Sequence, residues 1–188
     1  MNMMRYTTLI ATLLIGISTA TAQENVVDAK DEIHWLSFSE AYELNKITPK
    51  KWVIDISTSW CGWCKKMDKD TFMDSLIVDF VADNYYAVAL DGEYREVITL
   101  GEQSFKYVAE GRRGYHELPA ALMGGKMSYP TIVFLDDQMN NLSPLPGYKG
   151  PKDFMTLLEY FSIYHPEDNP ITWEVFKESY ESPYGEVN

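Results

Sequence analysis

The feature that most constrains this chain is Cys61-Gly62-Trp63-Cys64, which holds its only two cysteines. An apolar, strand-like run over 51–57 precedes the pair and a helix-like run follows it. A disulfide here would close a loop too short to restrain the unfolded chain much, so a stabilising staple explains the pair poorly. Two thiols at this spacing, at the start of a helix, can instead form and open a disulfide repeatedly. The motif therefore indicates thiol–disulfide exchange.

The N-terminus predicts an exported protein. Arg5 is followed by an apolar run over 9–17, too short to span a bilayer comfortably, and then by Ala20-Thr21-Ala22, whose small side chains suit a signal peptidase. We expect residues 1–22 to be a signal peptide that is removed before Gln23; an uncleaved membrane anchor is the alternative. The mature chain would be periplasmic or otherwise exported, in a compartment where thiols tend to oxidise. It would not be embedded in a membrane.

Composition indicates one folded domain and excludes some kinds of partner. Hydrophobic residues make up 46% of the 188 residues and aromatic residues 14%, well above the share in a disordered chain. The formal net charge of −12 argues against nucleic acid, which requires a basic surface. His34, His116 and His165 show no metal-ligand spacing, and two thiols alone do not build a four-ligand zinc site. We therefore predict neither a metal site nor a bound cofactor.

Hydrophobic periodicity and turn residues predict an α/β fold. Ser37 and Glu40 form a capping-box pattern at the start of a helix that should run to about Lys46. The other expected elements, in chain order, are a short edge strand over 33–36, a strand over 51–57, a helical stretch over 61–83, a strand over 86–91, a helix over 97–109, a glycine-rich stretch over 111–127 that is irregular at both ends, a strand over 130–135, a hairpin link to a strand ending at Gly147, and helices over 153–164 and 172–177.

Three pieces of the chain together resemble the thioredoxin superfamily. They are Asp55 to Lys65 with its Trp-Cys-x-x-Cys-Lys core, Ser128-Tyr129-Pro130-Thr131, and Pro146-Gly147-Tyr148. Their order and spacing fit the family from about Ile33 to Tyr164. The resemblance implies a thioredoxin fold, with a central mixed sheet flanked by helices.

The resemblance also divides the chain. It places the thioredoxin-like domain at 33–165, after an N-terminal extension over 23–32 and before a C-terminal tail over 166–188. Relative to a minimal thioredoxin, residues 94–127 form an insertion before the cis-proline strand. This insertion is either a partner-selecting lid or a decoration without a role.

The two cysteines are expected to have different roles. Cys61 falls at the helix N-terminus, where unpaired N–H groups and the macrodipole favour a thiolate, and it should be the more exposed of the two. We assign it as the nucleophile and Cys64 as the thiol that resolves the mixed disulfide. Asp55 matches the family's buried acid, which would take the proton from Cys64. The alternative for Asp55 is an ordinary carboxylate near the rim of the strand.

The resemblance also defines a partner-binding surface. Pro130 matches the family's cis-proline, which turns Tyr129 toward the cysteines so that its backbone can pair with an extended partner. The remaining residues expected on this surface are Trp60, Gly62, Trp63 and Gly147, although we favour packing as the main role of Trp60. The Gly-Trp pair between the cysteines differs from the Gly-Pro of reductive thioredoxins, which leaves the redox poise open.

These observations predict an exported enzyme, a thiol:disulfide oxidoreductase without a cofactor. Its partners would be exported proteins with thiols or disulfides. We favour a reductase, because Thr71-Phe72 and Asp91 resemble the exported domains that pass electrons to periplasmic partners. A reductase in an oxidising compartment requires a membrane electron-transfer protein as its supplier. The alternative is a non-catalytic thioredoxin-fold module that binds a polypeptide or copper.

Overall fold

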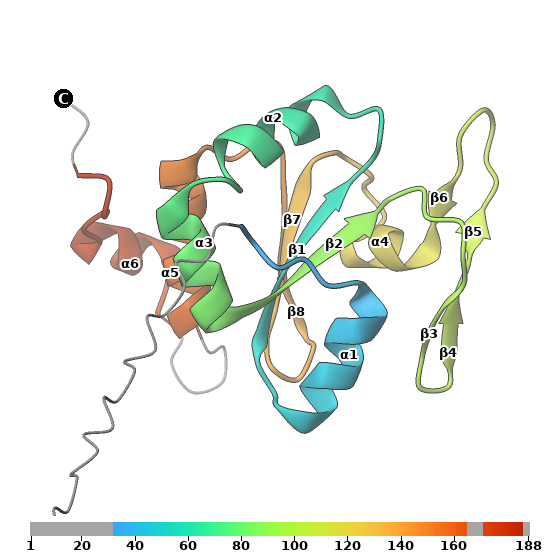
Figure 1. Ribbon diagram of the computed structural model, residues 1–188, viewed down its shortest axis with the longest axis horizontal. Helices are drawn as coiled ribbons and strands as arrows, with labels where there is room; N and C mark the ends of the chain where they lie inside the picture. The colour runs from blue at the N-terminus through green and yellow to red at the C-terminus, as the bar shows by residue number, and fades with distance from the viewer. Residues whose placement is uncertain (1–31, 165–170, 186–188) are drawn as a thin grey trace, which may run out of the picture.

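A four-stranded mixed sheet forms the centre of the protein, as the computed structural model shows for residues 32–164 and 171–185 (Figure 1). The strands lie in the order β2-β1-β7-β8; β1 is parallel to β2 and antiparallel to β7, and β7 is antiparallel to β8. The elements are α1 (Phe38–Ile47), β1 (Lys51–Ser57), α2 (Gly62–Asp70), α3 (Ser75–Asn84), β2 (Tyr85–Asp91), β3 (Ile98–Leu100), β4 (Gln103–Phe105), β5 (Tyr107–Val108), β6 (Tyr115–His116), α4 (Glu117–Leu122), β7 (Thr131–Leu135), β8 (Asn141–Pro146), α5 (Pro151–Ile163) and α6 (Trp173–Ser179).

Some sequence predictions fall outside these residues. The signal peptide at 1–22, nearly all of the 23–32 extension and His165 lie outside the described ranges. Within those ranges, no helix is long and apolar enough to cross a membrane.

The sheet has a separate apolar core on each face, because β1 is buried along nearly its whole length. Side chains alternate along a strand, so Trp52 and Ile54 point to one face and Val53 points to the other. The first face packs against α1 and α4, and the second packs against α2, α3, α5 and α6. Figure 1 shows the two groups of helices on opposite sides of the sheet. Asp55 shares the face of Val53 and therefore points toward the second group.

The predicted capping box at α1 is confirmed. The Ser37 hydroxyl accepts the Glu40 N–H at 3.2 Å, and the Glu40 carboxylate accepts the Ser37 N–H at 2.8 Å. The helix ends at Ile47, directly before Thr48 and Pro49. The edge strand expected over 33–36 is reduced to a single bridge, between Leu36 and Val88.

Two helix predictions were wrong. The stretch 61–83 is not one helix: α2 ends at Asp70, and the Asp74 side chain accepts the N–H groups of Leu76 and Ile77 and so begins α3. An aspartate that caps a new helix competes with continuation of the old one. The stretch 97–109 contains no helix but the hairpin β3–β4 and strand β5. Its β-branched residues favour extended backbone, and Gly101, at φ 60°, makes the turn.

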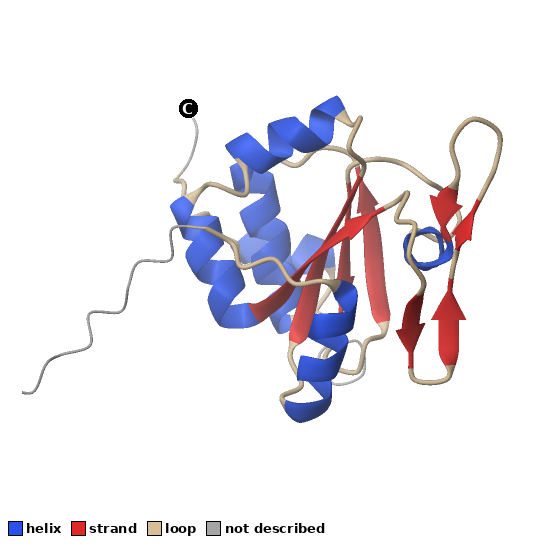
Figure 2. Ribbon diagram, turned by 45° about the vertical axis from the view of Figure 1, so that its right-hand side comes forward, coloured by secondary structure: helices blue, strands red, loops and turns tan. Residues whose placement is uncertain are grey.

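The 94–127 segment folds as an arm beside the sheet. It contains two small two-stranded sheets, β3–β4 and β5–β6, followed by α4. Figure 2 shows the strands standing away from the central sheet, and Figure 1 shows α4 between the sheet and β5–β6. Ile98, Leu118 and Met123 from this segment are buried in the core shared with α1, which fixes the base of the arm.

Lys51 ties the start of β1 to the end of α5. Lys51 is only 9% exposed, and burial lowers the pKa of its ammonium group. It donates to three backbone carbonyls at distances of 2.7 to 3.0 Å, those of Phe161, Ser162 and Tyr164. A helix leaves its last carbonyls without partners and favours a cation at this end, so Lys51 completes α5.

We expect Lys51→Met to lower the free energy of unfolding by roughly 2 kcal/mol, because the buried carbonyls lose a charged donor. Urea denaturation of the oxidised protein measures the change. Lys46→Met is the matched control, since Lys46 is exposed on α1, where it pairs with Glu43 and lies over the Tyr42 ring; it should change the midpoint little. Equal stability of Lys51→Met and the wild type would show that solvent satisfies the carbonyls equally well.

Candidate active site

The Cys61 sulfur caps the helix that follows it. The two cysteines form a disulfide with their Cα atoms 5.3 Å apart. Cys61 is the N-cap residue of α2, and its Sγ accepts the backbone N–H of Cys64 at 3.1 Å. After reduction, a thiolate at this position would be a stronger acceptor for the same N–H and would lie at the positive end of the helix dipole.

Exposure does not separate the two thiols, contrary to expectation. Cys61 is 4% exposed and Cys64 is 3% exposed. Both cysteines are therefore buried in the disulfide form. The position of Cys61 as the cap of α2 is therefore what distinguishes the two sulfurs. Gly62 between them is exposed, and a Cβ atom placed on it would have no neighbour within 4 Å.

Asp55 is a buried carboxyl group on the face of β1 that α2 covers. It is 6% exposed, and its Oδ1 atom has no hydrogen-bond partner in the described part of the chain. Burial raises its pKa to about 7, the charge of Asp68 adds to the increase, and a hydrogen bond from Ser57 opposes it. The alternative of a solvated rim carboxylate is therefore wrong. A carboxyl with this pKa can accept and return a proton near neutral pH.

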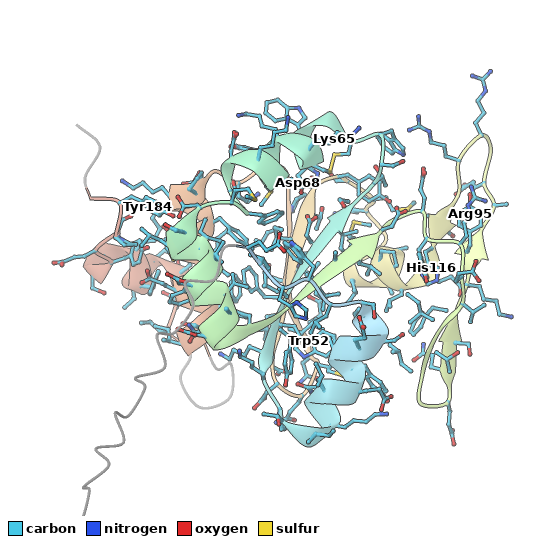
Figure 3. All side chains as sticks on the ribbon, in the orientation of Figure 1. Trp52, Lys65, Asp68, Arg95, His116 and Tyr184 are labelled. Carbon is cyan, nitrogen blue, oxygen red and sulfur yellow. A yellow bond between two sulfur atoms is a disulfide. The ribbon has the colours of Figure 1, made fainter. Side chains whose placement is uncertain are left out.

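Two further polar groups belong to this site and were missed by the sequence analysis. Asp68 lies one helical turn after Cys64 on α2, where Figure 3 labels it with Lys65. The i, i+4 spacing from Cys64 was the available signal, because it puts both side chains on one face of the helix. Thr58, between β1 and Cys61, is buried, and its hydroxyl has no described partner. Nothing in the local sequence marks it.

Two exposed tryptophans adjoin the cysteines in the chain, Trp60 before Cys61 and Trp63 between the two cysteines. Trp60 is 46% exposed and donates its indole N–H to Glu93 at 3.1 Å. Its ring contacts the edge of Tyr129, with the ring centres 5.8 Å apart. Trp63 is 60% exposed and packs on Tyr148, with ring centres 5.6 Å apart. Trp60 therefore packs against Tyr129, as predicted, while nearly half of its surface stays exposed to solvent.

The Tyr129–Pro130 peptide bond is cis, as predicted. Burial raises the pKa of the Tyr129 hydroxyl, with help from the charges of Glu93 and Asp91. In the described ranges, no hydrogen bond involves the Tyr129 backbone. Its N–H and C=O groups are therefore available to an extended chain.

Two glycines hold the Tyr129 segment in place. A Cβ atom on Gly92 would lie 2.3 Å from the Tyr129 hydroxyl oxygen, so only glycine leaves room for this ring. Gly147, at φ 87°, donates its N–H to the Pro130 carbonyl at 2.8 Å. Gly147 was predicted on the partner surface, and in the structure it lies beside Pro130, to whose carbonyl it is hydrogen-bonded. Gly92 was missed, because its role depends on a tyrosine far along the chain.

Metal ligands do not gather near the cysteines. No group of three or more histidine, cysteine, aspartate or glutamate side chains that could hold a metal ion occurs among residues 32–164 and 171–185.

Comparison with known proteins agrees with this geometry. The sequence model of a family described as a thioredoxin-like domain matches residues 38–162. An uncharacterized protein of Caenorhabditis elegans is 26% identical over 138 residues, which make up 72% of this chain and 17% of that much longer protein.

Solved structures share the fold at low identity. The DsbH oxidoreductase is 18% identical, with a TM-score of 0.51 over 79% of this chain and 96% of its own. A putative disulphide-isomerase from Bacteroides thetaiotaomicron is 24% identical, with a TM-score of 0.50 over 72% of this chain and 97% of its own. These similarities establish that the arrangement of strands and helices around the cysteines is the thioredoxin fold.

The raised pKa of Asp55 predicts a specific effect of Asp55→Asn on stability. In the unfolded chain this carboxyl ionises near its usual value of 3.8, whereas in the folded protein it ionises near 7. Between these values the folded state binds more protons than the unfolded state, so stability falls as the pH rises. A difference of one pKa unit between the folded and unfolded states corresponds to about 1.36 kcal/mol in the free energy of unfolding. The variant should therefore be more stable than wild type by up to about 4 kcal/mol near pH 8.

This gain should disappear below about pH 4, where both states bind the proton. Urea denaturation of the oxidised protein at several pH values measures it, with Asp79→Asn, an exposed change on α3, as the control. The same variant should release mixed disulfides more slowly. A less stable Asp55→Asn protein would identify a structural hydrogen bond instead of a buried proton acceptor.

Proposed function

The chain belongs to the thioredoxin-like domain family, and we propose that it is an exported thiol:disulfide oxidoreductase that acts on partner proteins through Cys61 and Cys64. The observation that carries this proposal is the redox-capable pair at the start of α2, with the Cys61 sulfur capping the helix. The buried carboxyl of Asp55, on the face of β1 covered by α2, supplies the proton acceptor that such chemistry needs.

In the reducing direction the reaction has two exchange steps. The Cys61 thiolate attacks one sulfur of a partner disulfide; a new S–S bond forms, the partner's bond breaks, and its other sulfur leaves as a thiolate that takes a proton. Asp55 then accepts the proton of Cys64. The Cys64 thiolate attacks the Cys61 sulfur, which closes the Cys61–Cys64 disulfide and releases the partner's second thiol.

Each cycle leaves the pair oxidised, so a second protein must return two electrons. We infer that this supplier is a membrane electron-transfer protein, since the expected signal peptide would place the chain outside the cytoplasm. The preference for the reducing direction rests on the resemblance of the flanking sequence to electron-passing domains. The names of the DsbH oxidoreductase and the putative disulphide-isomerase support exchange chemistry without fixing its direction.

The exposed aromatic side chains support polypeptide partners over small molecules. Trp60 and Trp63, which adjoin the cysteines in the chain, offer exposed apolar surface, and the backbone N–H and C=O groups of Tyr129 make no hydrogen bond to the described residues. An extended partner segment can pair with this backbone while its cysteine reaches Cys61.

Cysteine substitutions test the proposal. Wild type should catalyse reduction of insulin by dithiothreitol. Cys61→Ser should abolish this activity, and Cys64→Ser should accumulate mixed disulfides, because the resolving thiol is missing. In the reduced wild type, Cys61 should be alkylated faster than Cys64, and its thiolate should form below the usual pKa of about 8.5.

Non-reducing gels, mass spectrometry of trapped species and alkylation rates measured against pH give the readouts. Trapping by Cys61→Ser alone would reverse the assignment of the two thiols. If the wild type binds a polypeptide or copper stoichiometrically and shows no exchange activity, the protein is a binding module and not an enzyme.

A further inference from the structure

The base of the 94–127 arm is held firmly against the domain. The His116 N–H donates to the Gly92 carbonyl at 2.8 Å, and the His116 side chain is fully buried. Its Nδ1 accepts the Leu118 N–H and its Nε2 lies 3.1 Å from the Glu96 carbonyl oxygen, so both ring nitrogens have partners. Figure 3 labels His116 where the arm meets α4. The arm is therefore a fixed part of the structure.

The tip of the arm contacts the active site. The loop between β5 and β6 carries Arg113, whose guanidinium carbon lies 4.2 Å from the centre of the Trp60 ring. Glu93 holds the indole N–H of the same ring, and Tyr129 contacts it edge to face. In Figure 2 this loop rises to the level of the N-terminal end of α2. Trp60 thus joins the arm to the surface beside the disulfide.

Arg113 brings a positive charge to this surface. The chain as a whole carries a net charge of −12. Stacking on an aromatic ring leaves the N–H groups of a guanidinium free to bind a carboxylate. The described ion pairs join Lys46 to Glu43 and Lys66 to Asp70, and neither involves Arg113. The cation beside Trp60 is complementary to an acidic ligand.

We propose that Arg113 selects partner segments that carry a carboxylate side chain close to the reacting cysteine. The inference rests on the proposed function: a partner that brings its sulfur to Cys61 must pass its neighbouring residues over Trp60 and Tyr129. An acidic side chain within a few residues of the cysteine then reaches the guanidinium. The occupant of this surface is an extended segment of an exported polypeptide, with its cysteine beside an aspartate or glutamate.

Short peptides test this selection. Each has one cysteine linked to 5-thio-2-nitrobenzoate, with glutamate, glutamine or lysine two residues before or after it. The Cys61 thiolate of the reduced mature protein attacks the peptide sulfur, and the thionitrobenzoate that leaves is measured by its absorbance. Because every peptide has the same leaving group, differences in second-order rate constant report the flanking residue.

In one of the two positions, the glutamate peptide should react about threefold faster than the glutamine peptide at low salt, as expected for an exposed ion pair. The difference between the two rate constants should shrink as salt is added. Arg113→Gln should make the two peptides react equally, and Arg113→Glu should favour lysine. Arg112→Gln is the matched control, since Arg112 is the exposed neighbour on the same loop. It should keep the preference for glutamate and react normally with uncharged 2,2′-dithiodipyridine.

The results separate this inference from the proposed function. Rapid reaction without a preference for glutamate, or equal loss of the preference in Arg112→Gln and Arg113→Gln, overturns the selection by Arg113 and leaves the oxidoreductase intact. If the protein reacts with the peptides no faster than glutathione, a simple thiol, does, both the selection by Arg113 and the proposed oxidoreductase function are overturned.

Discussion

The active site depends on one local interaction, the capping of α2 by the Cys61 sulfur. β1 ends at Ser57 and the chain turns once before Cys61, whose N–H donates to the Thr58 carbonyl at 3.0 Å. The sulfur then takes the place of the oxygen that usually caps a helix. This geometry holds both cysteines at one helix end and gives the first of them a donor that a thiolate uses better than a thiol. The reactivity of the pair therefore follows from where a strand stops and a helix starts.

The second constraint is the buried carboxyl group of Asp55, one oxygen of which has no partner among the described residues. Among the described residues, the Asp55 Oδ1 and the Thr58 hydroxyl are buried without partners, whereas the buried ammonium group of Lys51 donates to three carbonyls. An unpartnered buried polar atom lowers stability, and such atoms concentrate where a protein carries out chemistry. The contrast between Lys51 and Asp55 separates a structural charge from a candidate catalytic one.

The sequence predicted the features that depend on short-range patterns. The strand over 51–57 and the Ser37 capping box were predicted from neighbouring residues, whereas the cis-proline and the mixed sheet were implied by the family resemblance. The helix break at Asp74 and the β-structure of 97–109 were missed, because hydrophobic spacing suited a helix in both places while capping and turn geometry decided otherwise. The contact of Arg113 with Trp60 joins residues far apart in the chain, and no local pattern could reveal it.

The Asp55 carboxyl group, which lies on the face of β1 that α2 covers, should exchange a proton near neutral pH. Carbon-13 NMR titration of the Asp55 carboxyl in the reduced and oxidised protein tests it most directly, with Asp55→Asn used to assign the signal. We expect a midpoint near 7, far above the usual value of 3.8. A midpoint at or below about 4, the range of a solvated aspartate, would contradict it.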